Sequence, residues 1–128
     1  NRTVTVDGKT GVRIVPLGDT SLAEVQRYQR RWKLRGDSLW QGKKGKINES
    51  GVVQMIRRLC HKAGVEFKGV HAFRRTAAAQ MKRLGMNDSD ILEVMGWKDV
   101  TMLMRYTSAV ATELAQVAHN RFSPGDSI

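Results

Sequence analysis

Cysteine, proline and long apolar runs are scarce or missing in this sequence, and each shortage excludes a class of protein. The 128 residues hold two prolines and one cysteine, Cys60. One cysteine excludes an internal disulfide and any zinc site built on a cysteine pair. Cys60 falls in the apolar pattern of a predicted helix, which indicates a buried, unreactive thiol and agrees with a reducing cytoplasm.

The apolar residues are spread along the chain rather than gathered into a membrane segment. They make up 41% of the sequence, and no run approaches the roughly 18 residues that a spanning helix needs. The amino-terminal residues also lack the pattern of a secretory signal. We therefore expect one globular domain over residues 1–128, large enough for a single core, with no membrane partner.

Acidic residues are few compared with basic ones. Lysine and arginine number 22 against 12 aspartate and glutamate, a formal charge of +10. The excess is concentrated in residues 27–46, where eight basic residues face only Asp37, a net +7: Arg27, Arg30, Arg31, Lys33, Arg35, Lys43, Lys44 and Lys46. This stretch is either a solvated surface with a mobile loop or a surface that contacts the phosphates of a polyanion.

The amino-terminal residues have the alternation of a β-hairpin. Val4 and Val6, then Val12 and Ile14, alternate with polar residues on either side of the glycine-rich segment 7–11. Lys9 falls at the tip, where an ordinary exposed lysine is the simplest interpretation. The remaining sequence predicts helices, so the expected fold is mainly α-helical with one small antiparallel sheet near the amino terminus.

Two helices are predicted before residue 65. The first opens at a capping box, Ser21-x-x-Glu24, and runs to about Leu34. Its expected core face is Leu22, Val25, Tyr28 and Trp32. A short extended segment, 38–40, and a loop over 41–46 lead to the second helix, which Asn48 caps and Gly64 ends. Its expected core face is Val52, Ile56, Leu59, Cys60 and Ala63.

The carboxy-terminal half predicts four helices. One opens near His71, buries a stripe and ends at Gly85; the stripe is Phe73, Ala77, Met81 and Leu84. A short helix runs from the Asn87/Asp88 cap to Gly96, and a third starts at the Asp99 cap. A separate final helix is expected over 112–120, and residues 121–128 read as a flexible tail.

Three short blocks in this half carry polar residues that can act together. His71 and Arg74 lie three apart on the first turn of a helix, so they project side by side near backbone N–H groups that could hold an anion. Trp97 follows 97 − 71 = 26 residues after His71, and Tyr106 follows 106 − 97 = 9 residues later. The ordered set, with helix breaks between its members, is far more specific than any block alone.

At these residues the chain resembles the tyrosine recombinases, or phage integrase family. The family signature is His-x-x-Arg, then Gly-His/Trp about two dozen residues on, then a nucleophilic Tyr nine residues later. Further similarities lie in the hairpin 6–17, the segment 38–40 and the Ala63-Gly64-Val65 step, so the resemblance covers nearly the whole chain. It implies the family's catalytic-domain fold and site-specific DNA recombination through a 3′-phosphotyrosine intermediate.

The resemblance also implies roles for five residues. Tyr106 is the nucleophile, and Arg74 binds the scissile phosphate. His71 either donates to the same phosphate or carries a proton, and Lys9 matches the lysine that the family carries on a hairpin. Trp97 occupies a position where many members have His, and it would donate a hydrogen bond and pack rather than act as a base. Neither a cofactor nor a metal is expected.

The resemblance leaves one family residue unmatched and suggests partners. Members carry another catalytic Arg before the lysine hairpin, and no residue here takes that role, so we expect the carboxy-terminal part of a larger recombinase, inactive alone. Its expected partners are double-stranded DNA and further copies of the full-length protein, which form a homotetramer on DNA. The expected location is the cytoplasm, for a protein encoded by a bacterium or a phage. The residues expected to contact DNA are Arg75, Lys43, Lys44, Lys46, Arg30 and Arg31.

Two other functions stay open from the sequence. A type IB topoisomerase would use similar chemistry to relax supercoils without joining two sites. A basic DNA-binding module without catalysis is the second alternative, because one expected arginine is missing. A covalent protein–DNA adduct would exclude the module, and strand exchange would exclude the topoisomerase.

Overall fold

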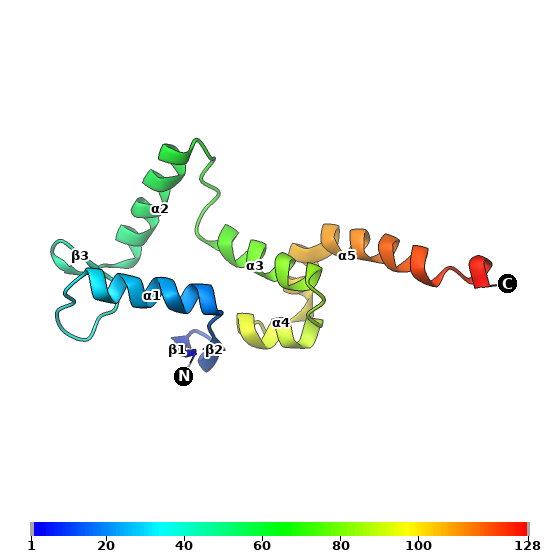
Figure 1. Cartoon of the computed structure of the whole chain (residues 1–128), viewed down its shortest axis with the longest axis horizontal. Helices are drawn as coiled ribbons and strands as arrows, with labels where there is room; N and C mark the ends of the chain where they lie inside the picture. Colours follow the sequence, from blue (N-terminus) through cyan, green and yellow to red (C-terminus); the bar gives the residue numbers. More distant parts are fainter. Residues whose placement is uncertain (1, 128) are drawn as a thin grey trace. The chain divides into compact units, whose positions relative to one another are not determined.

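The computed structural model describes residues 2–127, so the ends of the chain, including Ile128 of the predicted tail, lie outside the described residues. Its elements are coloured along the chain in Figure 1. In order they are β1 (Thr3–Gly8), β2 (Gly11–Pro16), α1 (Asp19–Arg31), β3 (Gln41–Gly42), β4 (Gly45–Lys46), α2 (Glu49–Ala63), α3 (His71–Arg83), α4 (Asp88–Met95), α5 (Val100–Phe122) and a 3₁₀ helix (Pro124–Ser127).

The chain forms two compact units. Unit 1 contains the chain up to Val6 together with Ile14–Val70, and unit 2 contains Asp7–Arg13 together with the chain from His71 onward. Unit 2 therefore contains, besides its helices, the tip of a hairpin from near the amino terminus. Among the described residues 2–127, no helix is both long and apolar enough to cross a bilayer.

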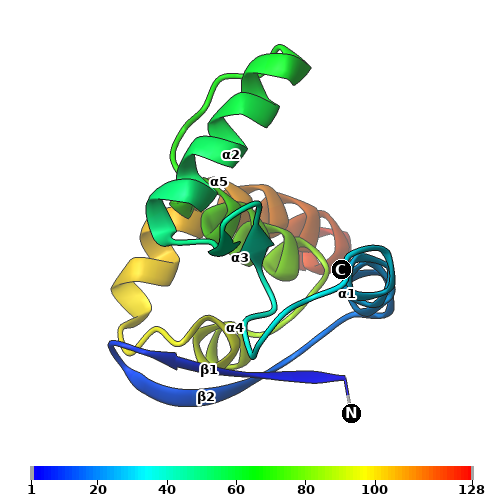
Figure 2. The ribbon, with the colours of Figure 1, turned by 90° about the vertical axis from the view of Figure 1, so that its left-hand side faces the viewer.

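The predicted hairpin is confirmed. Strands β1 and β2 form a two-stranded sheet, and Figure 2 shows them side by side. Lys9 and Thr10 make the turn between the strands, and Gly11 takes a φ of 101°, a value that side chains disfavour. At the other end the backbone N–H of Leu17 donates to the carbonyl of Arg2 over 2.6 Å.

The predicted start of the first helix is wrong. Helix α1 begins at Asp19, its N-cap is Gly18, and no side chain caps it within this described segment. Ser21 lies inside the first turn, so the capping box does not form. The helix starts earlier because Asp19 supplies the negative charge that a helix amino terminus favours and also pairs with Arg2. It ends at Arg31, before the predicted Leu34.

The predicted loop 41–46 contains a second, very small sheet. Gln41 pairs with Lys46 and Gly42 with Gly45 in antiparallel register. Gly45 has a φ of 105°, which permits the tight turn at Lys43 and Lys44.

Tyr28 holds this small sheet to α1. The backbone N–H of Gln41 donates to the Tyr28 hydroxyl over 3.2 Å, and the Tyr28 ring lies 5.3 Å from the Trp40 ring, centroid to centroid. The Gln41 side chain bonds the backbone of Arg35 and Ser38. Tyr28 is therefore a packing residue, as predicted.

Helix α2 has the predicted ends but not the predicted burial. Asn48 Oδ1 accepts from the N–H of Gly51 over 2.8 Å, and Gly64 ends the helix with a φ of 68°. No side chain of α1 or α2, both fully described, is buried, and Trp32 and Leu59 are each 57% exposed. Cys60 is half-buried rather than buried. An apolar stripe predicts which face is apolar, not whether another element covers it.

Unit 2 has the buried core, made where α3, α4 and α5 pack together. Its buried apolar residues are Ala78, Ile91, Met95, Leu103 and Val110. The ends of α3 and α4 agree with the prediction. The predicted stripe of α3 is right in its middle, where Met81 packs against the core and Ala77 is half-buried, but wrong at its two ends, because Phe73 and Leu84 are 60% and 80% exposed. The packed face centres on Ala78 because its small side chain lets the helices approach closely.

Helix α5 is one helix of 23 residues, so the separate helix predicted over 112–120 is wrong. No proline or glycine interrupts residues 100–122. The hydroxyls of Thr107 and Thr112 donate to the carbonyls of Leu103 and Ser108, four residues back. Polar side chains within the helix therefore bond along it instead of ending it.

Candidate active site

Three of the predicted catalytic residues, Arg74, Trp97 and Tyr106, lie together at the carboxyl end of α4. Gly96 ends the helix with a φ of 67°, and its N–H donates to the carbonyls of Leu92 and Glu93. The N–H of Trp97 then donates to the Leu92 carbonyl over 3.0 Å. This left-handed turn directs the Trp97 side chain back onto the core, where it packs beside the buried residues.

Trp97 and Tyr106 are in ring contact. Their centroids lie 5.6 Å apart and their planes are inclined by 43°. Tyr106 lies two turns into α5 and is half-buried, between the buried residues Leu103 and Thr107. Its hydroxyl makes no hydrogen bond with any residue that the structure describes.

Arg74 reaches the same place from the first turn of α3. Its Nη2 donates to the carbonyl of Met95, and its Cζ lies 5.8 Å from the centroid of the Trp97 ring. The last carbonyls of a helix have no partner within the helix and lie at its negative end, which explains the attraction of a guanidinium. A guanidinium has five N–H donors, so the Met95 contact leaves donors for an anion.

Arg75 lies on the nucleophile candidate itself. Its Cζ is 5.7 Å from the centroid of the Tyr106 ring, an arrangement typical of a cation–π contact. Arg75 makes no salt bridge with any residue in 2–127. Its predicted contact with DNA remains a prediction.

His71 is the first residue of α3 and is exposed. It lies one turn before Arg74, as the spacing predicts, but it makes no hydrogen bond or ion pair with any described residue. Its predicted phosphate contact remains a prediction.

Lys9 is exposed at the hairpin tip, and its neighbour fixes the tip to α4. The Thr10 hydroxyl donates to the carbonyl of Gly96 over 3.4 Å. A pocket of about 220 Å³ lies beside this bond, between residues 10–13 and the end of α4. Sequence reasoning missed Thr10 and also Arg13, whose guanidinium contacts Gly96. Their polar side chains close to Lys9 in the hairpin were the available signal.

The predicted DNA-contacting lysines lie in unit 1, around the turn of the small sheet. Lys43, Lys44 and Lys46 are exposed, and they line a cavity of about 620 Å³ together with Arg58 of α2, a residue that sequence reasoning missed. Arg30 and Arg31 are exposed in the last turn of α1. The cavity brings four positive charges together, which suits a phosphate backbone.

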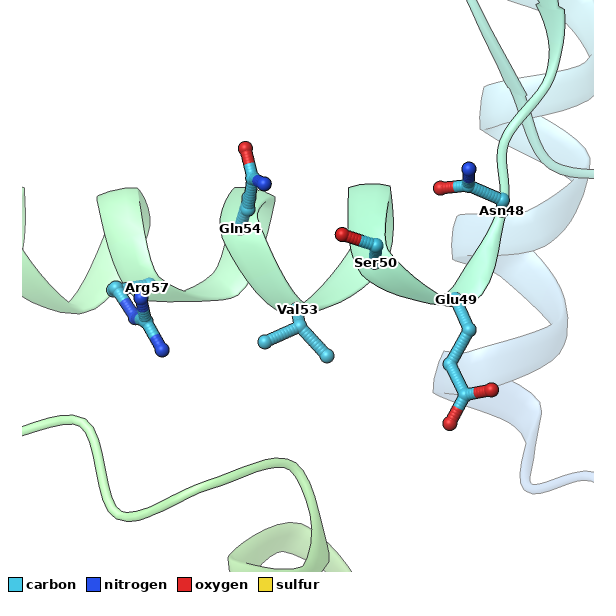
Figure 3. A pocket seen from close by; sticks show the side chains of 6 residues that line it. All are labelled: Asn48, Glu49, Ser50, Val53, Gln54 and Arg57. Carbon is cyan, nitrogen blue, oxygen red and sulfur yellow. The ribbon is translucent and has the colours of Figure 1, made fainter.

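The open surface along α2 is not a further site. A cavity of about 630 Å³ lies there. Figure 3 shows its six lining side chains, which come from α2 and from its cap, Asn48. One helix supplies only one wall, so it cannot enclose a ligand. Among residues 2–127, no group of three His, Cys, Asp or Glu side chains could hold a metal ion.

Asp99 fixes the start of the helix that carries Tyr106. Its carboxylate accepts the backbone N–H of Thr101 over 2.8 Å. This backbone hydrogen bond, followed by one with the Thr101 hydroxyl, lowers the pKa of Asp99 below its ordinary value of 3.8. The ionised carboxylate is therefore the form that caps the helix.

Three comparisons with known proteins agree. The model of the "Phage integrase family" matches residues 1–113. An integrase from Saccharopolyspora erythraea is 39% identical over 56 residues, which are 44% of this chain and 13% of that protein.

Solved recombinases share the fold. The XerA recombinase structure has a TM-score of 0.76 at 23% identity over 96% of this chain and 47% of its own. The XerH site-specific recombinase, solved with a palindromic difH substrate after cleavage, has a TM-score of 0.69 at 18% identity over 91% of this chain and 35% of its own. This chain thus spans less than half of each relative. The family match over most of its residues means that the chain belongs to the phage integrase family of tyrosine recombinases.

Proposed function

We propose that the chain is the carboxy-terminal part of the catalytic domain of a site-specific recombinase, which cuts and rejoins double-stranded DNA through a 3′-phosphotyrosine intermediate. One observation supports this most: Arg74 of α3, Trp97 on the turn after α4 and Tyr106 of α5 lie in contact around the end of α4. A phosphate beside that cluster would meet a nucleophile and a fixed positive charge together.

The proposed step exchanges one phosphoester for another. Tyr106 Oη bonds to phosphorus while the bond from phosphorus to the 5′-oxygen breaks. The phenolic proton passes to His71 or water, and the 5′-oxygen takes a proton from the Lys9 ammonium. The products are a 3′-phosphotyrosyl ester and a 5′-hydroxyl, and attack by another strand's 5′-hydroxyl reverses the step. Since the ester keeps the energy of the broken bond, rejoining needs no ATP.

Arg74 and Trp97 stabilise the phosphate in this scheme. Arg74 donates to the non-bridging oxygens, whose negative charge grows in the transition state, with a planar fork that lysine cannot reproduce. Trp97 offers its indole N–H and packs against the Tyr106 ring, so it also orients the nucleophile. Its indole cannot accept a proton, so no base step is assigned to it.

The remaining parts of the reaction come from beyond these residues. The unmatched family arginine and the rest of the DNA-binding surface belong, in our proposal, to a longer recombinase that acts as a tetramer on DNA in the cytoplasm. Support comes from the share of the relatives that this chain spans, 47% and 35% of the two solved recombinases. The exposed lysines of unit 1 and Arg58 add non-specific phosphate contacts.

The test is to trap the covalent intermediate. The complete recombinase is incubated with a nicked duplex and excess EDTA, and the peptide attached to DNA is identified. We expect attachment at Tyr106, loss of the adduct in Tyr106→Phe and a normal adduct in Tyr28→Phe, the matched control. Attachment elsewhere would refute the nucleophile, and loss of the adduct on chelation would refute metal-free cleavage. Relaxation of supercoils without strand exchange would favour a topoisomerase instead.

A further inference from the structure

We propose that Arg13 is a positioning residue that locks the Lys9 hairpin onto the Gly96–Trp97 turn and thereby places the Lys9 ammonium for proton transfer. The proposal rests on the proposed function, because it concerns the delivery of a proton to the 5′-oxygen. It names a residue that belongs neither to the His-x-x-Arg, Gly-Trp and Tyr signature nor to the predicted site.

The guanidinium of Arg13 occupies the space where Gly96 would carry a side chain. A Cβ built on Gly96 would lie 2.6 Å from Nη1, 2.7 Å from Cζ and 2.9 Å from Nε of Arg13. A Cβ built on Gly8 would lie 3.8 Å from Nη1. The group is thus held between the hairpin and the backbone of Gly96.

Two independent reasons therefore require glycine at position 96. Its φ of 67° lies in the left-handed region that side chains disfavour, and Arg13 fills the space that a side chain would need. The second reason links the end of α4 to the hairpin, because Arg13 can contact the Gly96 backbone only if position 96 has no side chain.

Packing and charge, rather than a direct hydrogen bond from Nε, hold the Arg13 group. Its Nε is buried and has no hydrogen-bond partner among the described residues. A cation at the carboxyl end of a helix is favoured by the helix dipole, and the guanidinium lies against the residue that ends α4. Arg74 takes the Met95 carbonyl and Thr10 takes the Gly96 carbonyl, so Arg13 supplies charge and volume.

These contacts anchor the turn that carries Lys9 at two points. Thr10 bonds the Gly96 carbonyl, and Arg13, two residues into β2, covers the Gly96 backbone. Lys9 itself makes no hydrogen bond, ion pair or cation–π contact with the described residues. A flexible four-carbon chain can deliver a proton efficiently only if its backbone is fixed, and a misplacement of about 1 Å can cost on the order of a hundredfold in rate.

The first experiment asks whether Arg13 acts through Lys9. Cleavage by the complete recombinase is compared on ordinary DNA and on DNA with sulfur at the bridging 5′-position. A thiolate needs no proton to leave, since thiol pKa values lie near 8.5. Lys9→Ala should lose roughly 10²–10⁴ in rate on ordinary DNA and regain most of it on sulfur.

Arg13→Ala should behave like a weaker Lys9→Ala. We expect a loss of about tenfold to a hundredfold on ordinary DNA and a matching recovery on the sulfur substrate. Arg74→Ala should recover little, because Arg74 binds the non-bridging oxygens, which the sulfur substrate leaves unchanged. Arg2→Ala, at the other end of the hairpin, is the control and should cleave both substrates normally. An equal loss on both substrates in Arg13→Ala overturns the proposal.

The two failures can be told apart. If Lys9→Ala is not rescued by sulfur while Tyr106 still forms the adduct, Lys9 is not the general acid. The positioning role of Arg13 then fails as well, but the role of Tyr106 as nucleophile is unaffected. If Lys9→Ala is rescued and Arg13→Ala is not, only the positioning role of Arg13 fails.

A second experiment tests the contact without measuring activity. Gly96→Ala puts a methyl group against Arg13, whereas Gly85→Ala, in the same unit with a φ of 92° and open space around it, measures backbone strain alone. We expect Gly96→Ala to lower the Tm of the 128-residue chain by about 4 °C or more beyond Gly85→Ala. Adding Arg13→Ala should remove that excess. Equal Tm decreases in the two glycine variants would overturn the contact.

Discussion

The ring contact between Trp97 and Tyr106 gives the sharpest test of how the nucleophile is held. The centroid distance of 5.6 Å and the tilt of 43° lie within the range of favourable aromatic pairs. Such a pair contributes about 0.5–1.5 kcal/mol beyond the burial of its rings. We therefore predict that Trp97→Ala and Tyr106→Ala are coupled by that amount in the free energy of unfolding.

The single substitutions should change the free energy of unfolding by more than the coupling does, but they are less informative. Trp97→Ala also removes packing on the core and the interaction with Arg74, whose Cζ lies 5.8 Å from the ring centroid. That cation–π interaction alone contributes about 0.5–1 kcal/mol. Truncation of a fully buried aromatic ring costs about 3–5 kcal/mol, and half-buried Trp97 should cost less. Only the coupling term isolates the contact with the nucleophile.

The measurement is a double-mutant cycle by denaturant unfolding of the wild-type chain, both single variants and the double variant. The control cycle pairs Trp97→Ala with Thr112→Ala instead of Tyr106→Ala. Thr112 lies six residues further along α5, about 9 Å of helix rise, and within residues 2–127 its hydroxyl bonds only the Ser108 carbonyl. That cycle should be additive to within about 0.3–0.5 kcal/mol. A Trp97–Tyr106 coupling no larger than the control would refute the ring contact as the support of the nucleophile.

Two further predictions concern charge. Changing Lys43, Lys44 and Lys46 together to Ala should weaken DNA binding. It should also lower the slope of log binding constant against log salt concentration by about 0.9 for each phosphate that is no longer neutralised. DNA titrations at several salt concentrations measure this slope, and an unchanged slope would mean that the three lysines form only a solvated surface. The folded pKa of Asp99 lies below its unfolded value, so its stabilisation is full above the unfolded pKa and disappears as pH falls through the folded one. We expect circular dichroism to detect loss of helix as pH falls below 3.8, with a smaller loss in Asp99→Asn; equal losses in both would show that other groups set the acid response.

Helix ends were the most predictable part of the fold. Asn48, Gly64, Gly96 and Asp99 end or cap helices as the sequence indicates, because a cap is a local hydrogen bond or a single backbone conformation. The capping box at Ser21 fails because two residues earlier the chain leaves the hairpin directly into a helix. Local chemistry was decisive only where no neighbouring element competed.

Burial was the least predictable part. Periodicity placed Leu59 and Phe73 in a core, yet they are 57% and 60% exposed, because coverage depends on partners that a pattern does not name. The site had the same limit. The spacing of Arg74, Trp97 and Tyr106 predicted their gathering. The contact of Arg13 with Gly96 joins residues far apart in sequence, and the position of Arg13 close to Lys9 in the hairpin does not indicate which residue it meets.

The bond between Thr10 and Gly96 has a consequence for the order of folding. It spans 86 residues, whereas α3, α4 and α5 follow one another directly along the chain. Closing so long a loop costs roughly 4 kcal/mol in chain entropy at (3/2)RT ln n, so we expect the three helices to assemble first and the hairpin tip to dock afterwards. Packing of the helices and completion of the active site would then be separate steps of folding. A newly made chain could hold Tyr106 and Arg74 together before the hairpin had brought Lys9 to the site.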